Sequence, residues 1–155
     1  MYEQETQMQR HPGDSAAQKA AETTALALLS ERLGLPLSKR RFPLPEGGWL
    51  EVDAVSDSPP VLCEIWAHQG PPKPAQKAKV MTDAMKLLYA RTLLPVGSRD
   101  CRMLLVFADG LAAAHFQRTS WMAAALRAVG IELVVVDLPD DVRVRVQQAQ
   151  ELQYR

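Results

Sequence analysis

Residues 49–68 read WLEVDAVSDSPPVLCEIWAH, and this stretch decides the fold that the sequence predicts. Apolar and acidic residues alternate from Trp49 to Val55, which is the two-residue period of a β-strand. A second strand is predicted from Val61 to His68, and the short turn at residues 57–60 makes an antiparallel hairpin the natural pairing. On the first strand, one predicted face carries Leu50, Val52 and Ala54, and the other carries Glu51 and Asp53.

The elements around this hairpin predict an α/β fold with a mixed central sheet and helices on both faces. Apolar residues recur at helical spacing before and after the hairpin, and two apolar runs near the C-terminus predict parallel strands joined by a helix. A flexible tail over residues 1–14 and a single domain over residues 15–155 are expected. The predicted elements are helices over 16–33, 75–93, 121–129 and 140–153, strands over 102–108 and 131–136, and a basic connector with a short edge strand at 39–45.

Composition excludes several classes of protein. The chain has 155 residues, with 18 Lys and Arg against 18 Asp and Glu, so a broadly basic nucleic-acid binder is excluded while a local basic patch is not. Cys63 and Cys101 lie in apolar runs, which favours two thiols of a reduced protein over a disulfide. Because no signal peptide and no apolar run of membrane-spanning length is visible, we expect a cytoplasmic protein without a membrane partner.

Acidic residues on strands that otherwise look buried are the most unusual feature. Glu51 and Asp53 share a predicted face, and Glu64 follows on the adjoining strand between Cys63 and Ile65. A carboxylate among such neighbours is costly to desolvate unless it is paired, hydrogen-bonded or bound to a metal ion. Two carboxylates on a hairpin would attract a hard cation such as Mg²⁺, which can activate water against a phosphodiester.

Two structural explanations of these acids remain open. Glu51 and Asp53 would equally suit the solvent-exposed face of an edge hairpin, where carboxylates need no partner. Glu64 would equally be stabilised by an ion pair with Lys79 or Lys77 that has no catalytic role.

The pattern Glu51-Val52-Asp53, a turn, then Glu64-Ile65-Trp66, with a helix on each side, resembles the PD-(D/E)XK nuclease superfamily. The resemblance implies an α-β-β-β-α-β restriction-endonuclease-like core, here with an extra C-terminal helix. It also implies a nuclease that acts on DNA with Mg²⁺ or Mn²⁺. Asp53 matches the first acid of the family and Glu64 the acid of its (D/E)-x-K tripeptide. Glu51 would be an accessory metal ligand, Ile65 would lend a backbone carbonyl, and Gln76 looks like an orienting glutamine.

The chain departs from the family at the lysine of that tripeptide, where Trp66 stands. The family's lysine positions water and stabilises developing charge, which a tryptophan cannot do. His68 on the same strand face, or Lys79 on the following helix, would be its substitute. The alternative is a catalytically inactive nuclease-fold module that binds nucleic acid or protein within a larger complex.

Cationic residues flank the acidic hairpin in the sequence. Because cations position a phosphate backbone, these two segments predict a nucleic-acid contact, as part of a monomer, a homodimer or a larger complex. The alternative is an ordinary solvated helix face with a spaced pair between Lys79 and Asp83. The candidate contacts are Lys39, Arg40 and Arg41 in the connector, and Lys73, Lys77 and Lys86 in the second helix and its leading loop.

Overall fold

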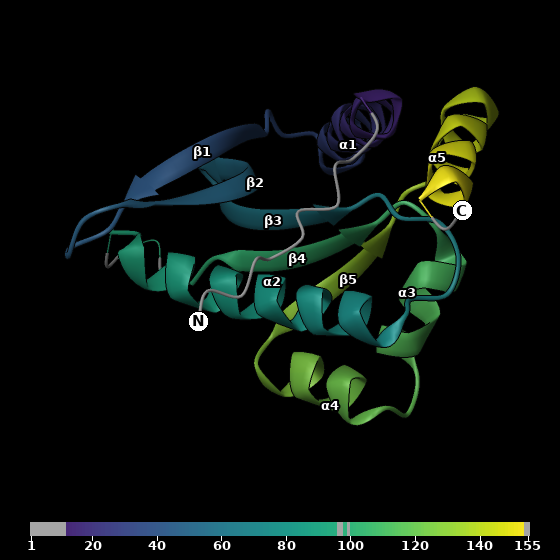
Figure 1. Cartoon of the computed structure of the whole chain (residues 1–155). Helices are drawn as coiled ribbons and strands as arrows, with labels where there is room; N and C mark the ends of the chain where they lie inside the picture. The colour runs from purple at the N-terminus through teal and green to yellow at the C-terminus, as the bar shows by residue number, and fades with distance from the viewer. Residues whose placement is uncertain (1–11, 96–97, 99, 154–155) are drawn as a thin grey trace, which may run out of the picture.

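The computed structural model describes residues 12–95, 98 and 100–153, and these form an α/β fold with a five-stranded mixed sheet, as the sequence predicts. Helices cover both faces of the sheet (Figure 1). The elements in chain order are α1 (Pro12–Leu33), β1 (Ser38–Pro43), β2 (Trp49–Asp57), β3 (Pro60–Trp66), α2 (Pro74–Leu93), β4 (Arg102–Phe107), α3 (Gly110–Gln117), α4 (Trp121–Ala128), β5 (Ile131–Val135) and α5 (Asp140–Leu152).

The five strands lie side by side in chain order, β1 to β5. β2 is antiparallel to both β1 and β3, so the predicted hairpin is confirmed. β3, β4 and β5 are mutually parallel, because α2 and then α3 with α4 carry the chain back between them. The sheet therefore has an antiparallel half that bears the acids and a parallel half that is mostly apolar.

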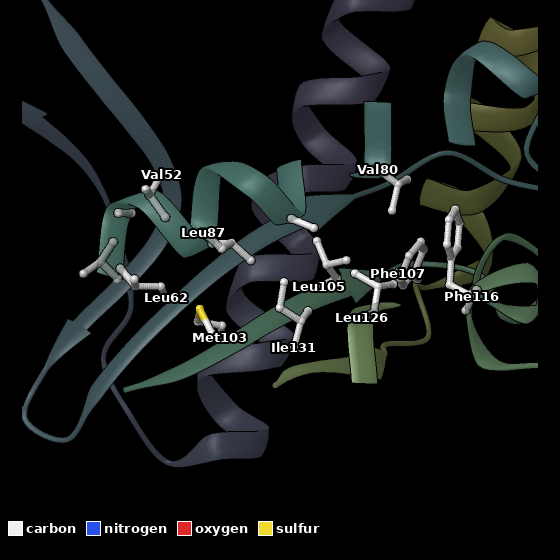
Figure 2. Packing of buried hydrophobic residues seen from close by; sticks show 14 of the residues in the cluster. Val52, Leu62, Val80, Leu87, Met103, Leu105, Phe107, Phe116, Leu126 and Ile131 are labelled. Carbon is white, nitrogen blue, oxygen red and sulfur yellow. The ribbon is translucent and has the colours of Figure 1, made fainter. Parts of the chain in front are cut away.

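Two hydrophobic cores hold the helices to the sheet. α2, α3 and α4 cover one face, where Leu62 of β3 and Phe107 of β4 belong to the same core as Leu87 of α2 (Figure 2). α1 and α5 lie side by side on the other face, over Cys63 and Leu104. β4 is buried on both sides, as its continuous apolar sequence predicts. Both cysteines are free thiols.

Most element boundaries differ from the sequence predictions by one or two residues, and three differences matter for the site or the fold. α1 begins at Pro12, so part of the expected tail is helical, whereas residues 1–11 lie outside the described part of the chain. β3 ends at Trp66, which leaves His68 in the following loop. α3 occupies residues where the sequence predicts only a turn at Asp109-Gly110. This helix has only eight residues and begins with glycine, so it is too short for a helical period to be recognised in the sequence.

The sequence predicts that Ala54 lies on the same face of β2 as Val52, and this prediction is wrong because β2 contains a β-bulge. Ser38 of β1 pairs with Val55, but Arg40 pairs with Val52, so β2 contains one extra residue opposite this step. Consequently Val52 packs into the α2-side core, whereas Ala54 packs into the α1-side core. Asp53 lies between them, at the bulge.

None of the helices within residues 12–153 that the structure describes is long and apolar enough to span a membrane.

The α2-side core generates a stability prediction. Leu87→Ala removes a fully buried side chain and is expected to lower the free energy of unfolding by about 2–5 kcal/mol. Met85→Ala on the same helix truncates a side chain that is 65% exposed and is expected to change it by about 0.5 kcal/mol or less. Urea denaturation followed by circular dichroism measures both. Equal losses would contradict the packing of α2 described above.

Candidate active site between the sheet and helix α2

Asp53 is placed by the bulge of β2. The paired register of β2 with β3 ends at Ala54 and Cys63, and beyond it the Ile65 N–H donates to Asp53 Oδ2 over 2.9 Å. The carboxylate therefore takes the place of a backbone acceptor and ties β2 to β3 where their ladder stops. The Asp53 carboxyl also lies within hydrogen-bond reach of the carboxyl of Glu64, the residue before Ile65.

Glu64 is buried, with only 3% of its surface exposed, and its Oε1 is in contact with the Lys86 ammonium. β3 presents the Glu64 side chain toward α2, on the same face as Leu62. Lys86 reaches it from the fourth turn of α2 and is itself mostly shielded from solvent. The partner of Glu64 is therefore Lys86, rather than Lys79 or Lys77, the partners considered from the sequence.

Burial raises the pKa of the Glu64 carboxyl to about 9, together with a hydrogen bond and repulsion from Asp53 and against the opposing effect of Lys86. Burial lowers the pKa of Lys86, but Glu64, Asp83 and Asp53 together outweigh burial, so its net shift is upward. One ammonium thus lies among three acidic side chains. Burial therefore opposes ionisation of the Glu64 carboxyl, whereas its acidic neighbours favour the charged form of Lys86.

A second lysine lies at the solvent-exposed rim of this cluster. Burial raises the pKa of Asp83 on α2, and Lys79 and Lys86 act against that rise. The Lys79 ammonium lies 3.6 Å from Asp83 Oδ1, which is the pair that the four-residue spacing predicts. The Lys79 side chain is 63% exposed, so it offers a cation to a molecule that approaches from solvent.

Helix α2 runs in the opposite direction to β3 (Figure 1). Its polar residues contact side chains of β3 and of the loop that follows β3. Lys86 is opposite Glu64 at one end, and Gln76 is opposite His68 at the other. Trp66 lies between these ends and packs against the α2-side core. Its buried Nε1–H has no hydrogen-bond acceptor within the described chain.

Gln76 and His68 contact each other at the start of α2. Gln76 Oε1 accepts the Lys73 N–H over 2.8 Å, which leaves its Nε2 facing His68 Nε2 at 3.1 Å. An amide nitrogen only donates, so this His68 nitrogen must be the unprotonated acceptor. Burial and the charge of Lys73 lower the pKa of His68, which agrees with a neutral ring. His68 is thus engaged with Gln76 rather than with the two acids.

The predicted site residues of β1 and Glu51 form ion pairs of their own, although Lys39 also lines the small cavity that contains Asp53. Glu51 is exposed and pairs with Lys39 at 3.3 Å and Arg41 at 3.2 Å. Arg40 forms two hydrogen bonds of 2.7 Å to the Asp57 carboxylate. The cations of β1 are therefore balanced by acids of β2.

Lys73 and Lys77 border two separate cavities. Lys73 borders a cavity of about 550 Å³ beyond the ends of β3 and β4, which is also lined by His68 and Asp109. Lys77 borders a cavity of about 560 Å³ beside α3 and the start of α4.

Sequence reasoning missed three participants. The sequence predicts Lys86 as a nucleic-acid contact, although it is the cation at Glu64, and it suggests Asp83 only as a partner of Lys79. Both belong to one stripe of α2 at three- and four-residue spacing, which is the signal that points to them. Glu22 of α1 lines a small cavity of about 90 Å³ with Asp53, and its position depends on tertiary packing that no local pattern reveals.

The donor chemistry of Asp53 and Glu64 fits a hard divalent ion. No group of three or more His, Cys, Asp or Glu side chains suited to a metal ion occurs among residues 12–95 and 100–153. Mg²⁺ is commonly bound by one or two carboxylates, with water and substrate phosphate oxygens completing the shell. Asp53 and Glu64 would hold such an ion, whereas Glu51 is engaged with Lys39 and Arg41 and does not join them.

The pKa of Glu64 predicts how stability depends on pH. The folded chain keeps this proton up to about pH 9, while the unfolded chain releases it near the ordinary value of 4.5. Between these values the unfolded state binds fewer protons, so the free energy of unfolding falls as pH rises, by at most about 1.4 kcal/mol per unit. Glu64→Gln should remove this contribution, as measured by urea denaturation from pH 6 to pH 9.

Glu51→Gln is the control for this measurement. At Glu51 the carboxyl pKa is lowered instead of raised, because Arg41 and then Lys39 donate hydrogen bonds to it. That contribution is present above the ordinary pKa and is lost only in acid, so the effect of the substitution should be nearly constant from pH 6 to pH 9. Parallel stability curves for wild type and Glu64→Gln would contradict a raised pKa at Glu64.

Comparisons with known proteins return no relative: no family model matches the chain, and neither the curated proteins nor the solved structures contain a significant match. The chemical groups of the site are two neighbouring carboxyl groups and a lysine from the adjacent helix.

Proposed function

We propose that the protein is a divalent-metal-dependent nuclease that hydrolyses phosphodiester bonds in nucleic acid. The observation that carries the proposal is the contact of Lys86 with Glu64 beside Asp53. The PD-(D/E)XK resemblance requires two acids and a lysine, and the tripeptide lacks the lysine because of Trp66. Lys86 supplies an ammonium to the same pair of acids from α2.

The architecture supports this proposal. The first six elements follow the order α-β-β-β-α-β that the resemblance implies, and α3, α4, β5 and α5 follow them. Asp53 lies at a β-bulge, and bulges are frequent next to active sites because they redirect a side chain. The Lys79 ammonium at the rim adds a second cation for phosphate oxygens.

The chain's own residues have distinct roles in the proposed chemistry. A bound Mg²⁺ or Mn²⁺ would polarise the phosphodiester and lower the pKa of its attacking water. Asp53 and Glu64 would hold that ion, and Glu64 would first release its proton to solvent. Lys86 stabilises negative charge on the phosphate oxygens, while Lys79 holds the approaching phosphate at the rim. Gln76 and His68 fix the start of α2 and thus the direction of its stripe.

The first test is cleavage of linear, nicked, branched and single-stranded DNA by the purified protein in Mg²⁺ or Mn²⁺. Asp53→Asn and Lys86→Met are each expected to reduce the cleavage rate by about 10²-fold or more, because they remove a ligand and the charge beside it. Lys79→Met is expected to raise KM more than it lowers kcat. Gel-based initial rates at several substrate concentrations separate these effects.

Glu132→Gln and Arg102→Gln are the matched controls, since they remove one acid and one cation of the exposed β4–β5 pair. Both should retain the wild-type cleavage rate. Absence of cleavage on every substrate, or cleavage that survives Asp53→Ala and Glu64→Ala, would exclude the proposed activity.

Trp66 favours a second candidate function, an inactive nuclease-fold module that binds nucleic acid or protein. The tryptophan packs into the α2-side core at the position of the family's lysine, and its Nε1–H has no acceptor in the described part of the chain. In that case the Glu64–Lys86 pair would serve only to fix α2 on the sheet. The two candidates differ in divalent-ion binding.

Titration calorimetry with Mg²⁺ and Mn²⁺ distinguishes them. A nuclease is expected to bind one of these ions at millimolar concentration or below, and binding at pH 7 should release close to one proton, because Glu64 must ionise. Repeating the titration in buffers of different ionisation enthalpy counts the protons. Asp53→Asn should abolish binding, whereas Asp57→Asn should not. A protein that binds neither ion is the inactive module.

A further inference from the structure

Outside the candidate active site, α2, α3 and the loop before α4 enclose a cationic cavity of about 560 Å³. Lys77 and Arg118 border it, and the lining also contains His115 and the hydroxyl residues Thr119 and Ser120. Within residues 12–95, 98 and 100–153, no acidic residue lines the cavity, and neither Lys77 nor Arg118 has an ion-pair partner. Two uncompensated cations in a hollow favour a bound anion.

An apolar groove of about 900 Å³ adjoins this cavity along the outer side of α2. Trp121 is 69% exposed there, and Tyr89 is also exposed. Thr119 and Ser120 of the cavity directly precede Trp121, and Lys86 lines the groove as well. The groove therefore lies between the cationic cavity and the lysine that contacts Glu64. Its further apolar lining is Leu50, Ala78, Met81, Met85 and Met122.

The chemistry of this surface identifies a class of ligand. Exposed aromatic rings offer stacking surfaces, and the cations at the two ends offer charge to phosphates. Proteins that bind single-stranded nucleic acid combine these two features, because bases stack on aromatic rings while phosphates follow the cations. A duplex hides its bases in its own stack and would leave the rings unused. A second copy of this chain would cover the groove without bringing a phosphate to each end.

We propose that single-stranded nucleic acid binds along α2, with a phosphate in the cavity of Lys77 and Arg118 and bases on Trp121 and Tyr89. Lys77 and Lys86 are nine residues apart on one helix, which is about 14 Å along its axis and about half a turn around it, so the strand crosses the groove between them. The proposal deepens the proposed function by naming its substrate as a single strand. It rests on that function only in the statement that the bound strand leads toward Glu64.

The test measures binding without cleavage. Fluorescence anisotropy of a labelled oligothymidylate of about twelve nucleotides, long enough to span one such site, is followed in EDTA at several salt concentrations. Trp121→Leu is expected to weaken binding about tenfold through lost stacking. Arg118→Gln should weaken it severalfold and reduce the slope of log K against log salt by about 0.7, because one phosphate contact is lost. A trinucleotide should bind much more weakly than the longer strand.

Matched controls lie outside the groove. Trp49→Leu removes an aromatic side chain of similar exposure, 64%, from β2. Arg145→Gln removes an exposed arginine from α5, which lies on the opposite face of the sheet (Figure 1). Both should leave the affinity within about twofold of wild type, because neither side chain stacks on a base or meets a phosphate in the proposed path. Controls that weaken binding as much as Trp121→Leu and Arg118→Gln would overturn that path.

Other outcomes separate this proposal from the proposed nuclease activity. A strand that binds as predicted, without cleavage in any metal ion, supports the path and contradicts the nuclease. Cleavage whose KM is unchanged by Trp121→Leu and Arg118→Gln supports the nuclease and overturns the path. Equal affinity for duplex and single strand overturns it too. The path is also overturned if sedimentation velocity shows a wild-type dimer that Trp121→Leu converts to a monomer, since a second copy of the chain would then occupy the groove.

Discussion

A carboxyl group buried in a sheet must keep its proton, meet a cation or bind a metal ion, and Glu64 constrains the molecule for this reason. Its side chain points toward α2, so the helix must place a cation opposite Glu64. Lys86 does so only because Leu87, the next residue, packs into the core and fixes the rotation of the helix. The same rotation places Asp83 beside Lys86 and sets Lys79 at the rim.

Much of the fold follows from hydrophobic periodicity. The alternation through Val61 to Trp66 predicts that Glu64 lies on the face opposite Cys63, and the two cores agree. The bulge at Asp53 could not be predicted, because the alternation in the sequence continues through it and only the pairing with β1 reveals the extra residue. α3 escapes prediction because its buried residues are few and mostly small.

The sequence predicts which residues belong to the candidate site, but it does not predict which of them contact one another. The stripe of Gln76, Lys79, Asp83 and Lys86 is visible from spacing alone. Which lysine meets Glu64 depends on where β3 ends and how the loop to α2 runs, and both are tertiary properties.

For the cations of β1, the sequence suggests residues that are available to nucleic acid although the structure shows them paired with acids. Lys39, Arg40 and Arg41 look available in the sequence, yet the hairpin brings Glu51 and Asp57 against them. A net charge of zero therefore conceals an uneven distribution of paired and unpaired cations.

Three features of the molecule depend on α2. Its inner side packs on the sheet, one flank faces Glu64 and its outer side lines the apolar groove. A single residue inserted between Gln76 and Lys86 would turn everything after it by about 100°. The contact of Lys86 with Glu64, the core contact of Leu87 and the exposed position of Tyr89 would all be lost together. The length of this segment is therefore under a stricter constraint than the identity of any one residue in it, and natural variants of this chain should differ here by substitution rather than by insertion or deletion.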